Sequence, residues 1–348
     1  MTTPYSSAYM GYVGFVRFQA NNPFNATAMT IRATTADIML KQEIMKPDVI
    51  DSRYDKTVYQ LGPQEVGGAI GFPAVYDMQG GGNVVATLFK YVAMRDQIGN
   101  LYPFSVDVKY AASTSPADAA DFTFGGCIIN SWKFSVTNKD YVKIDTDIIG
   151  LTRNPATFNN DWNFNPVSSS SNNYATENTR IVTWADARFE LISGKQQIIN
   201  SIVPSLNGSS VRSFEVSINN NAERFYTLNG QLYPQAVAPT KRDITGTIVL
   251  MGRNNDLGSF AASNQTRSYE DSCINFGFTT TSSSGVSNAF GTKLPNIVFQ
   301  IEEMSLTKDL FESTVKWHSL PAAGIYMGPT GSSNDPLIAN LNNITWSN

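Results

Sequence analysis

The segments Phe214-Glu215-Val216-Ser217-Ile218-Asn219 and Gly246-Thr247-Ile248 decide the fold, because the first half of the chain carries a matching set. The earlier counterparts are Ala36-Asp37-Ile38-Met39-Leu40-Lys41 and Gly68-Ala69-Ile70. In each half the glycine follows the acidic residue by 31 positions, and the two sets lie 178 positions apart. A spacing shared over a strand, a long loop and a second strand indicates duplication. Duplicated β units favour a ring or an array over a lone enzyme.

Strand alternation predicts that each unit contains a sheet with one dry face and one wet face. Apolar and polar residues alternate through 132–136 and 142–148 in the first half, and through 296–302 and 311–317 in the second. Successive side chains of a strand point to opposite faces, so this pattern is typical of strands that cover a core on one side. Four such strands in each unit would present their polar face to water or to a lumen.

The order of elements predicts a mainly β fold with two tandem domains, each with a short flanking helix. Domain 1 spans 1–153, a linker or surface loop rich in Asn and Ser spans 154–180, and domain 2 with a C-terminal arm spans 181–348. The apolar spacing in 84–95 predicts a helix after the glycines, and 257–263 is a second short candidate. Residues 138–140 predict a tight hairpin turn.

Composition excludes several classes of protein. The chain has 348 residues, which is enough for two cores without a disulfide or metal. Its formal net charge is −4, whereas a protein that grips nucleic acid needs a surplus of Lys and Arg. Cys127 and Cys273 are expected to be small buried hydrophobes. We expect no signal peptide, no membrane helix and assembly in a cytosol.

Catalytic and metal sites are not predicted. His318 is the only histidine, so the residues cannot form a His-based metal site from pairs, and no catalytic triad is recognisable. We therefore expect no enzyme activity, no metal and no cofactor.

The chain resembles the tail tube (major tail) proteins of tailed bacteriophages. The resemblance follows an ordered set of features over most of the chain: the opening 14–18, the strand at Asp37 with its long loop to Gly68, the helix after the glycines and the strand 129–134. In the second half it continues through 211–221, 246–248 and 294–299. Specificity comes from the order and spacing of these features, because no single motif is sharp.

The resemblance implies β-sandwich or barrel domains that assemble into stacked rings around a channel for DNA ejection. Such a ring would place about 24 strands around the channel, four from each of six domains, with a circumference of about 115 Å before strand tilt. Two domains per chain favour a trimeric, pseudo-sixfold ring; a hexamer with one half lining the channel is the alternative. Expected partners are further copies of the chain, tape measure, terminator and baseplate or tip proteins, and DNA in transit. The expected location is the virion tail, assembled in the host cytoplasm.

Strand parity and the resemblance together give candidate residues. If the apolar face packs on the helix layer, the wet face would line the lumen, where acidic side chains would repel phosphates. The candidates are Asp37, Lys41, Glu43, Asp145, Asp147, Glu215, Asp243, Glu302 and Glu312. The long loops 45–56 and 219–241 are the candidate contacts between rings. Their candidate residues are Lys46, Asp48, Asp51, Arg53, Asp55, Lys56, Arg224, Tyr226 and Tyr233.

Two other classes stay open at this stage. One is a different β-sandwich virion protein, such as a capsid or decoration protein. The other is a carbohydrate-binding adhesin module, which the content of Asn, Ser, Thr and aromatic residues would suit.

Overall fold

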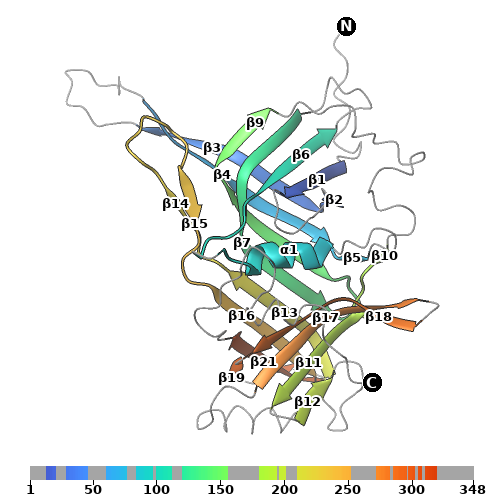
Figure 1. The fold of residues 1–348 in the computed structure, drawn as a ribbon. Coiled ribbons are helices and arrows are strands. Elements are labelled where there is room, and N and C mark those ends of the chain that lie inside the picture. The colour runs from blue at the N-terminus through green and yellow to red at the C-terminus, as the bar shows by residue number, and fades with distance from the viewer. Residues whose placement is uncertain are drawn as a thin grey trace.

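The protein is described from a computed structural model, and the part of the chain that the structure describes is mainly β (Figure 1). The described residues are 13–20, 29–45, 60–76, 84–96, 99–111, 120–155, 180–193, 196–200, 210–251, 272–282, 285–295, 297–301, 305–307 and 310–319. Within these ranges one helix, α1 (Val84–Ala93), accompanies the strands. The predicted mainly β fold is therefore confirmed.

One long antiparallel sheet runs through both halves of the chain. Its strands follow the order β3-β4-β8-β7-β13-β16-β21-β19. The first half supplies β3 (Thr35–Met45), β4 (Gln60–Pro73), β7 (Ala120–Thr137) and β8 (Lys143–Gly150). The second half supplies β13 (Ser210–Asn219), β16 (Asp243–Met251), β19 (Ile297–Ile301) and β21 (Leu310–Ser319), with β20 (Ser305–Thr307) also paired to β21. The two sets of four meet where β7 pairs with β13.

The 31-residue spacing found in the sequence corresponds to equivalent positions in two of these ladders. Gly68 lies opposite Ile38, and Gly246 lies opposite Val216. Each glycine is needed because a Cβ would strike the neighbouring strand: at Gly68 it would lie 1.7 Å from the carbonyl oxygen of Asp37, and at Gly246 2.2 Å from that of Glu215. The repeated glycine therefore marks a close approach of two backbones that occurs in both halves.

A second layer of strands covers part of the dry face. In the first half it contains β1 (Val13–Ala20), β2 (Met29–Arg32), β6 (Phe104–Ala111) and β9 (Thr152–Pro155), which join the N-terminal part of β7. In the second half β11 (Ala187–Ser193), β12 (Gln196–Asn200), β17 (Ser272–Ser282) and β18 (Gly285–Pro295) form a separate sheet in the order β12-β11-β17-β18. The long strand β7 pairs with β6 through its N-terminal part and with β8 through its C-terminal part. In the second half the corresponding pairings are divided among three strands: β18 pairs with β17, and β19 and β20 pair with β21.

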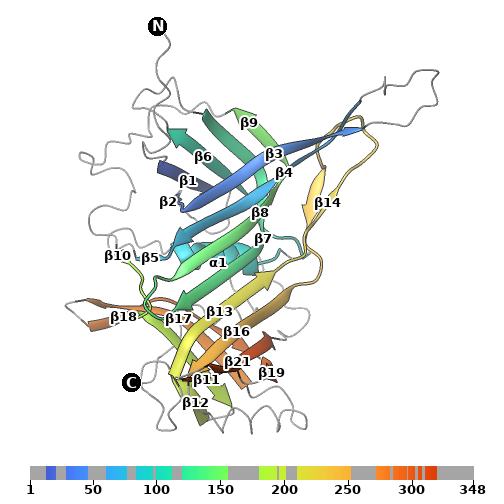
Figure 2. The ribbon, with the colours of Figure 1, turned by 180° about the vertical axis from the view of Figure 1, so that it is seen from behind.

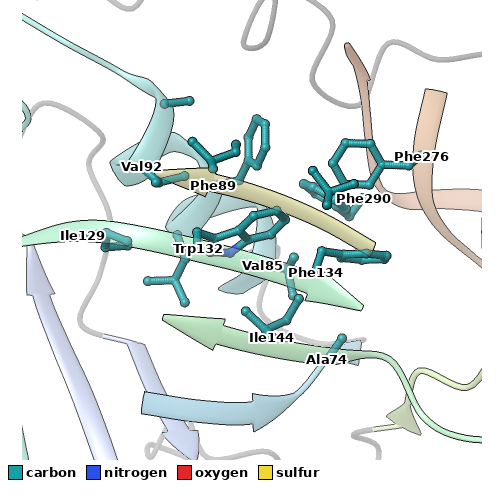
Figure 3. Close-up of a cluster of buried hydrophobic side chains, with 14 of the residues drawn as sticks. Ala74, Val85, Phe89, Val92, Ile129, Trp132, Phe134, Ile144, Phe276 and Phe290 are labelled. Carbon is teal, nitrogen blue, oxygen red and sulfur yellow. The ribbon is translucent and has the colours of Figure 1, made fainter. Parts of the chain in front are cut away.

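Aromatic side chains from both halves share one core around α1 (Figure 3). The Phe89 ring of α1 lies 5.3 Å from Trp132 of β7 and 5.6 Å from Phe290 of β18, measured between centroids. Phe134 and Phe276 are likewise 5.3 Å apart. The helix predicted over 84–95 is confirmed and ends at Ala93.

The remaining described elements are short. The turn predicted at 138–140 joins β7 to β8, with Lys139 at φ 69°. The strand β5 (Val75–Tyr76) pairs with β10 (Arg180–Ile181). The predicted loop 219–241 contains a small hairpin of β14 (Glu223–Phe225) and β15 (Ala236–Ala238). The helix candidate 257–263 and most of the linker lie outside the described residues.

Candidate lumen face and assembly edges

The face of the long sheet opposite α1 carries its polar side chains, and Figure 2 shows this face with the helix behind it. In β3 the buried residue Ile38 is flanked by the exposed Asp37 and Met39. In β13 the buried Phe214, Val216 and Ile218 alternate with half-buried polar residues. The same alternation in β7, β8, β16 and β21 gives one polar face across both halves, as the sequence predicted. Its charged residues, among those whose side chains the structure describes, include Asp37, Lys41, Glu65, Lys133, Lys143, Asp145, Asp147, Glu215, Asp243 and Lys316.

Several charged side chains on this face have ion-pair or hydrogen-bond partners. Lys133 Nζ lies 2.8 Å from the Glu215 carboxylate, across the β7–β13 junction. Asn130 donates a hydrogen bond of 3.1 Å to Asp147. At the β7–β8 turn, Lys143 donates to Asp140 at 2.6 Å, and this bond lowers the pKa of Asp140 and raises that of Lys143. The face is mixed in sign rather than uniformly acidic.

Three predicted lumen residues stand apart from this set. Glu43 is exposed on β3 beyond the part of the β3–β4 pair that β8 joins, so it lies on a projecting two-stranded arm. Glu302 lies outside the described residues, and Glu312 is in β21 but its side chain is outside the described part of the chain.

The two ends of the long sheet are edges. Among the described residues, β3 pairs with β4 alone, and β19 and β20 pair with β21 alone. β3 has 11 residues and its side chains from Lys41 to Met45 are all exposed. An edge strand can present backbone N–H and C=O groups to another chain.

The arm of β3 and β4 is held by the hairpin from the second half, as Figure 1 shows at the upper left. Gln64 N–H donates to the Leu232 carbonyl at 2.8 Å, and Arg224 Nη2 donates to the Val66 carbonyl at 2.7 Å. Tyr226 Oη donates to the Gln64 carbonyl at 3.1 Å. Arg224 also lies 3.7 Å from Glu65. These contacts join the two halves a second time, away from the β7–β13 ladder.

The predicted loop residues are therefore placed unequally. Arg224 and Tyr226 contact the first half of their own chain, and Tyr233 is half-buried. Lys46, Asp48, Asp51, Arg53, Asp55 and Lys56 lie outside the described residues. Large apolar side chains are nonetheless exposed on this arm and its hairpin: Ile44, Met45, Leu61, Phe225 and Leu228.

A buried asparagine at the end of β13 was not found from the sequence. Asn220 donates its side-chain amide to the Val92 carbonyl of α1 at 2.9 Å and to the Ile129 carbonyl of β7 at 3.1 Å. Its Oδ1 accepts from Arg95 at 3.3 Å. The three consecutive asparagines 219–221 were the only signal, and nothing in them shows that the middle one is buried.

The described residues show no grouping suited to metal binding. Within the ranges given above, no three His, Cys, Asp or Glu side chains gather closely enough to hold a metal ion. His318 is exposed on β21. No helix among the described residues is long and apolar enough to cross a membrane.

Within the described ranges, an antiparallel sheet with one polar face, one covered apolar face and an edge strand at each end is typical of a structural protein that pairs with further copies. The phage tail tube protein profile matches residues 26–342, nearly the whole chain. The chain belongs to the phage tail tube protein family. It is a structural component of the phage tail that self-assembles into a tube and joins other tail proteins; the capsid, decoration and adhesin alternatives are not favoured. A search of curated proteins found no match.

Proposed function

We propose that three copies of this chain form one ring of the tail tube, with pseudo-sixfold symmetry and both halves lining the channel. One observation supports this proposal. The second half continues the sheet of the first half, because β13 pairs with β7 and is followed by three strands in the corresponding order. The two halves of one chain are therefore arranged as two neighbouring subunits of a ring would be. The tandem tube units would be 1–153 and 181–348, linked by 154–180. In a hexamer with only one half at the channel, the four strands of the other half would have to turn away from the channel. These strands belong to the same continuous sheet, so this arrangement is less favourable.

The polar face of the long sheet would line the channel. Asp37, Asp145, Asp147, Glu215 and Asp243 would repel DNA phosphates, so that DNA passes without sticking. Lys41 shares this face, and Lys133 and Lys143 are paired with carboxylates there. The untested candidates Glu43, Glu302 and Glu312 belong to the same proposal, with Glu43 nearer the rim.

The β3–β4 arm and its β14–β15 hairpin would contact the adjacent ring. The exposed Ile44, Leu61 and Leu228 supply apolar area that stacking would bury. The charged residues between Lys46 and Lys56, together with Tyr233, would add complementary contacts. Tape measure, terminator and baseplate or tip proteins would join the ends of the tube, and assembly would occur in the host cytoplasm without a catalytic step.

Electron microscopy of the purified chain at high concentration tests the proposal. Hollow rods with a regular axial repeat, three chains per repeat and strands from both halves at the channel are expected. Six chains per repeat would overturn the trimer, and discrete particles at every concentration would overturn assembly of the isolated chain into tubes.

A further inference from the structure

The internal junction between the two halves gives a template for the junction between two chains. β7 and β13 pair over seven residues, from Ser131 opposite Asn219 to Thr137 opposite Ser213. If the two halves are equivalent, the same pairing should recur between chains. The first-half strand that corresponds to β13 should then pair, in the same register, with the second-half strand of a neighbouring copy that corresponds to β7. Both equivalent strands can be identified from the ladders alone.

The first equivalence is β13 with β3. In the β13–β16 ladder, Ser213 to Asn219 lie opposite Val249 to Asp243. In the β3–β4 ladder, Thr35 to Lys41 lie opposite Gly71 to Glu65. All seven pairs coincide after the 178-residue shift, so Glu215 corresponds to Asp37 and Asn219 to Lys41.

The second equivalence is the C-terminal part of β7 with β19 and β20. The β4–β8 ladder and the β16–β21 ladder coincide pair for pair, with Asp147 corresponding to Lys316 and Lys143 to Glu312. β8 places Ser131 opposite Asp147 and Ser135 opposite Lys143. β21 places Gln300 opposite Lys316 and Ser305 opposite Glu312.

Ser131 therefore corresponds to Gln300, and Ser135 corresponds to Ser305. Gln300 and Ser305 are one residue farther apart in sequence than Ser131 and Ser135. The β21 ladder accommodates one extra residue between Ile301 and Ser305, because Ile301 faces Val315 while Ser305 faces Glu312.

We propose that β3 of one copy pairs antiparallel with β19 and β20 of the next copy, in the register that β13 keeps with β7. Lys41 then lies opposite the partner's Gln300, Leu40 opposite the partner's Ile301, and Asp37 opposite the partner's Ser305. The contact is head to tail, so it continues from copy to copy until the ring closes. This inference rests on the proposed ring and adds the strand pairing that closes it.

Cysteine pairs test the register directly. Residues opposite each other on antiparallel strands have Cα atoms about 4.5 to 5.5 Å apart, which a disulfide can span, whereas diagonal neighbours at about 7 to 8 Å lie beyond its usual reach. The test pair is Asp37→Cys with Ser305→Cys in the full chain. The shifted control is Met39→Cys with Ser305→Cys, because Met39 lies on the same face as Asp37 two residues away. The calibration is Ser135→Cys with Glu215→Cys, the corresponding pair within one chain.

Assembled protein is oxidised and then separated on a denaturing gel without reductant. The test pair should give a covalent ladder with a yield about tenfold above that of the shifted pair, since only the opposite residues meet the geometry of a disulfide. Mixing the two single variants should give one dimer band, and neither single variant should dimerise alone. The native thiols should not interfere, because Cys127 and Cys273 are buried.

The outcomes separate the register from the ring itself. A covalent ladder from the shifted pair would overturn the proposed register. The absence of a ladder from the test pair would also overturn it, provided that the calibration pair forms its disulfide and electron microscopy still shows rods. Neither result would contradict the tube itself. Dimers of Asp37→Cys alone would show that β3 pairs with itself and would overturn the head-to-tail contact. A test-pair ladder that runs to six chains would support the register and overturn the trimer.

Discussion

Gly246 lies beneath the indole of Trp317: a Cβ at this glycine would be 2.1 Å from Cζ2 of the ring and 2.2 Å from the Glu215 carbonyl oxygen. Trp317 is fully buried and lies directly opposite on β21. A methyl group at this position would have to displace both the ring and the adjacent strand. The glycine therefore fixes how closely three strands of the second half can pack.

Gly246→Ala should lower the free energy of unfolding by about 1 to 3 kcal/mol, the usual cost of forcing extra volume into a packed core. Gly68→Ala should cost at least as much, because its Cβ would meet the backbone of β3 and its φ is 151°. Urea denaturation of the unassembled protein measures both. The control is Thr247→Ala on the polar face of the same strand. A change at Gly246 no larger than that of the control would contradict the close approach.

The β7–β13 junction should depend on apolar burial rather than on its ion pair. Ile218→Ala removes a fully buried side chain opposite Trp132 and should cost about 2 to 5 kcal/mol. Lys133→Gln breaks the ion pair to Glu215, but both side chains are about 40% exposed, so the loss should stay below about 1 kcal/mol. The same denaturation measurement compares the two variants. Equal losses would show that the ion pair matters more than its exposure implies.

Asn220 should contribute far more to stability than Asn221, its half-buried neighbour. Asn220→Ala leaves the buried carbonyls of Val92 and Ile129 without their shared donor, at a cost of about 2 to 4 kcal/mol for the two groups. The control is Asn221→Gly, which keeps the positive φ of 47° and removes only exposed hydrogen bonds. Its loss should be below about 1 kcal/mol, as for other exposed bonds. A larger loss at Asn221 would reverse this assignment.

The features that depend on neighbouring residues in the sequence, such as the faces of each strand, could be predicted. The features that depend on contacts between distant segments, such as which strands pair, could not. Alternation showed the faces of the strands because side-chain direction follows from strand geometry alone. The 31-residue spacing to Gly68 and Gly246 was detectable because a close backbone approach excludes every other residue. The pairing of β7 with β13 was not predicted, since many strands share the same alternation and only the assembled core selects the neighbour. The contacts of Arg224 with Val66 were missed for the same reason.

Stability should fall in alkali as buried acids ionise in the unfolded chain. Burial raises the pKa of the Cys127 thiol to about 12 from an ordinary 9.0. Because the folded pKa is raised, this contribution is complete below the unfolded value and is lost as pH rises from about 9 to 12. Urea midpoints across this range should fall, and Cys127→Ala should show a shallower slope. An unchanged slope would mean that the thiol does not drive the loss, with Tyr91, also raised to about 12, as the next group to replace.

Assembly should close the polar face of the long sheet to large reagents while leaving it open to small ones. Ser217 lies on that face in β13, and Ala185 is exposed in the turn before β11. Ser217→Cys should react with N-ethylmaleimide in unassembled protein and in tubes, because the channel is hollow. It should react with a maleimide carried on a globular protein only before assembly.

Ala185→Cys is the matched control and should react with both reagents in both states. Mass spectrometry of labelled tubes measures the extent of each reaction, with electron microscopy to confirm that the tubes are intact. If Ser217→Cys in tubes accepts the large reagent as fast as Ala185→Cys does, the polar face lies outside the tube. The acidic side chains around Glu215 would then have no part in keeping DNA from the wall. If neither reagent reaches Ser217→Cys in tubes, the face is buried between subunits instead, and the channel must be lined by other strands.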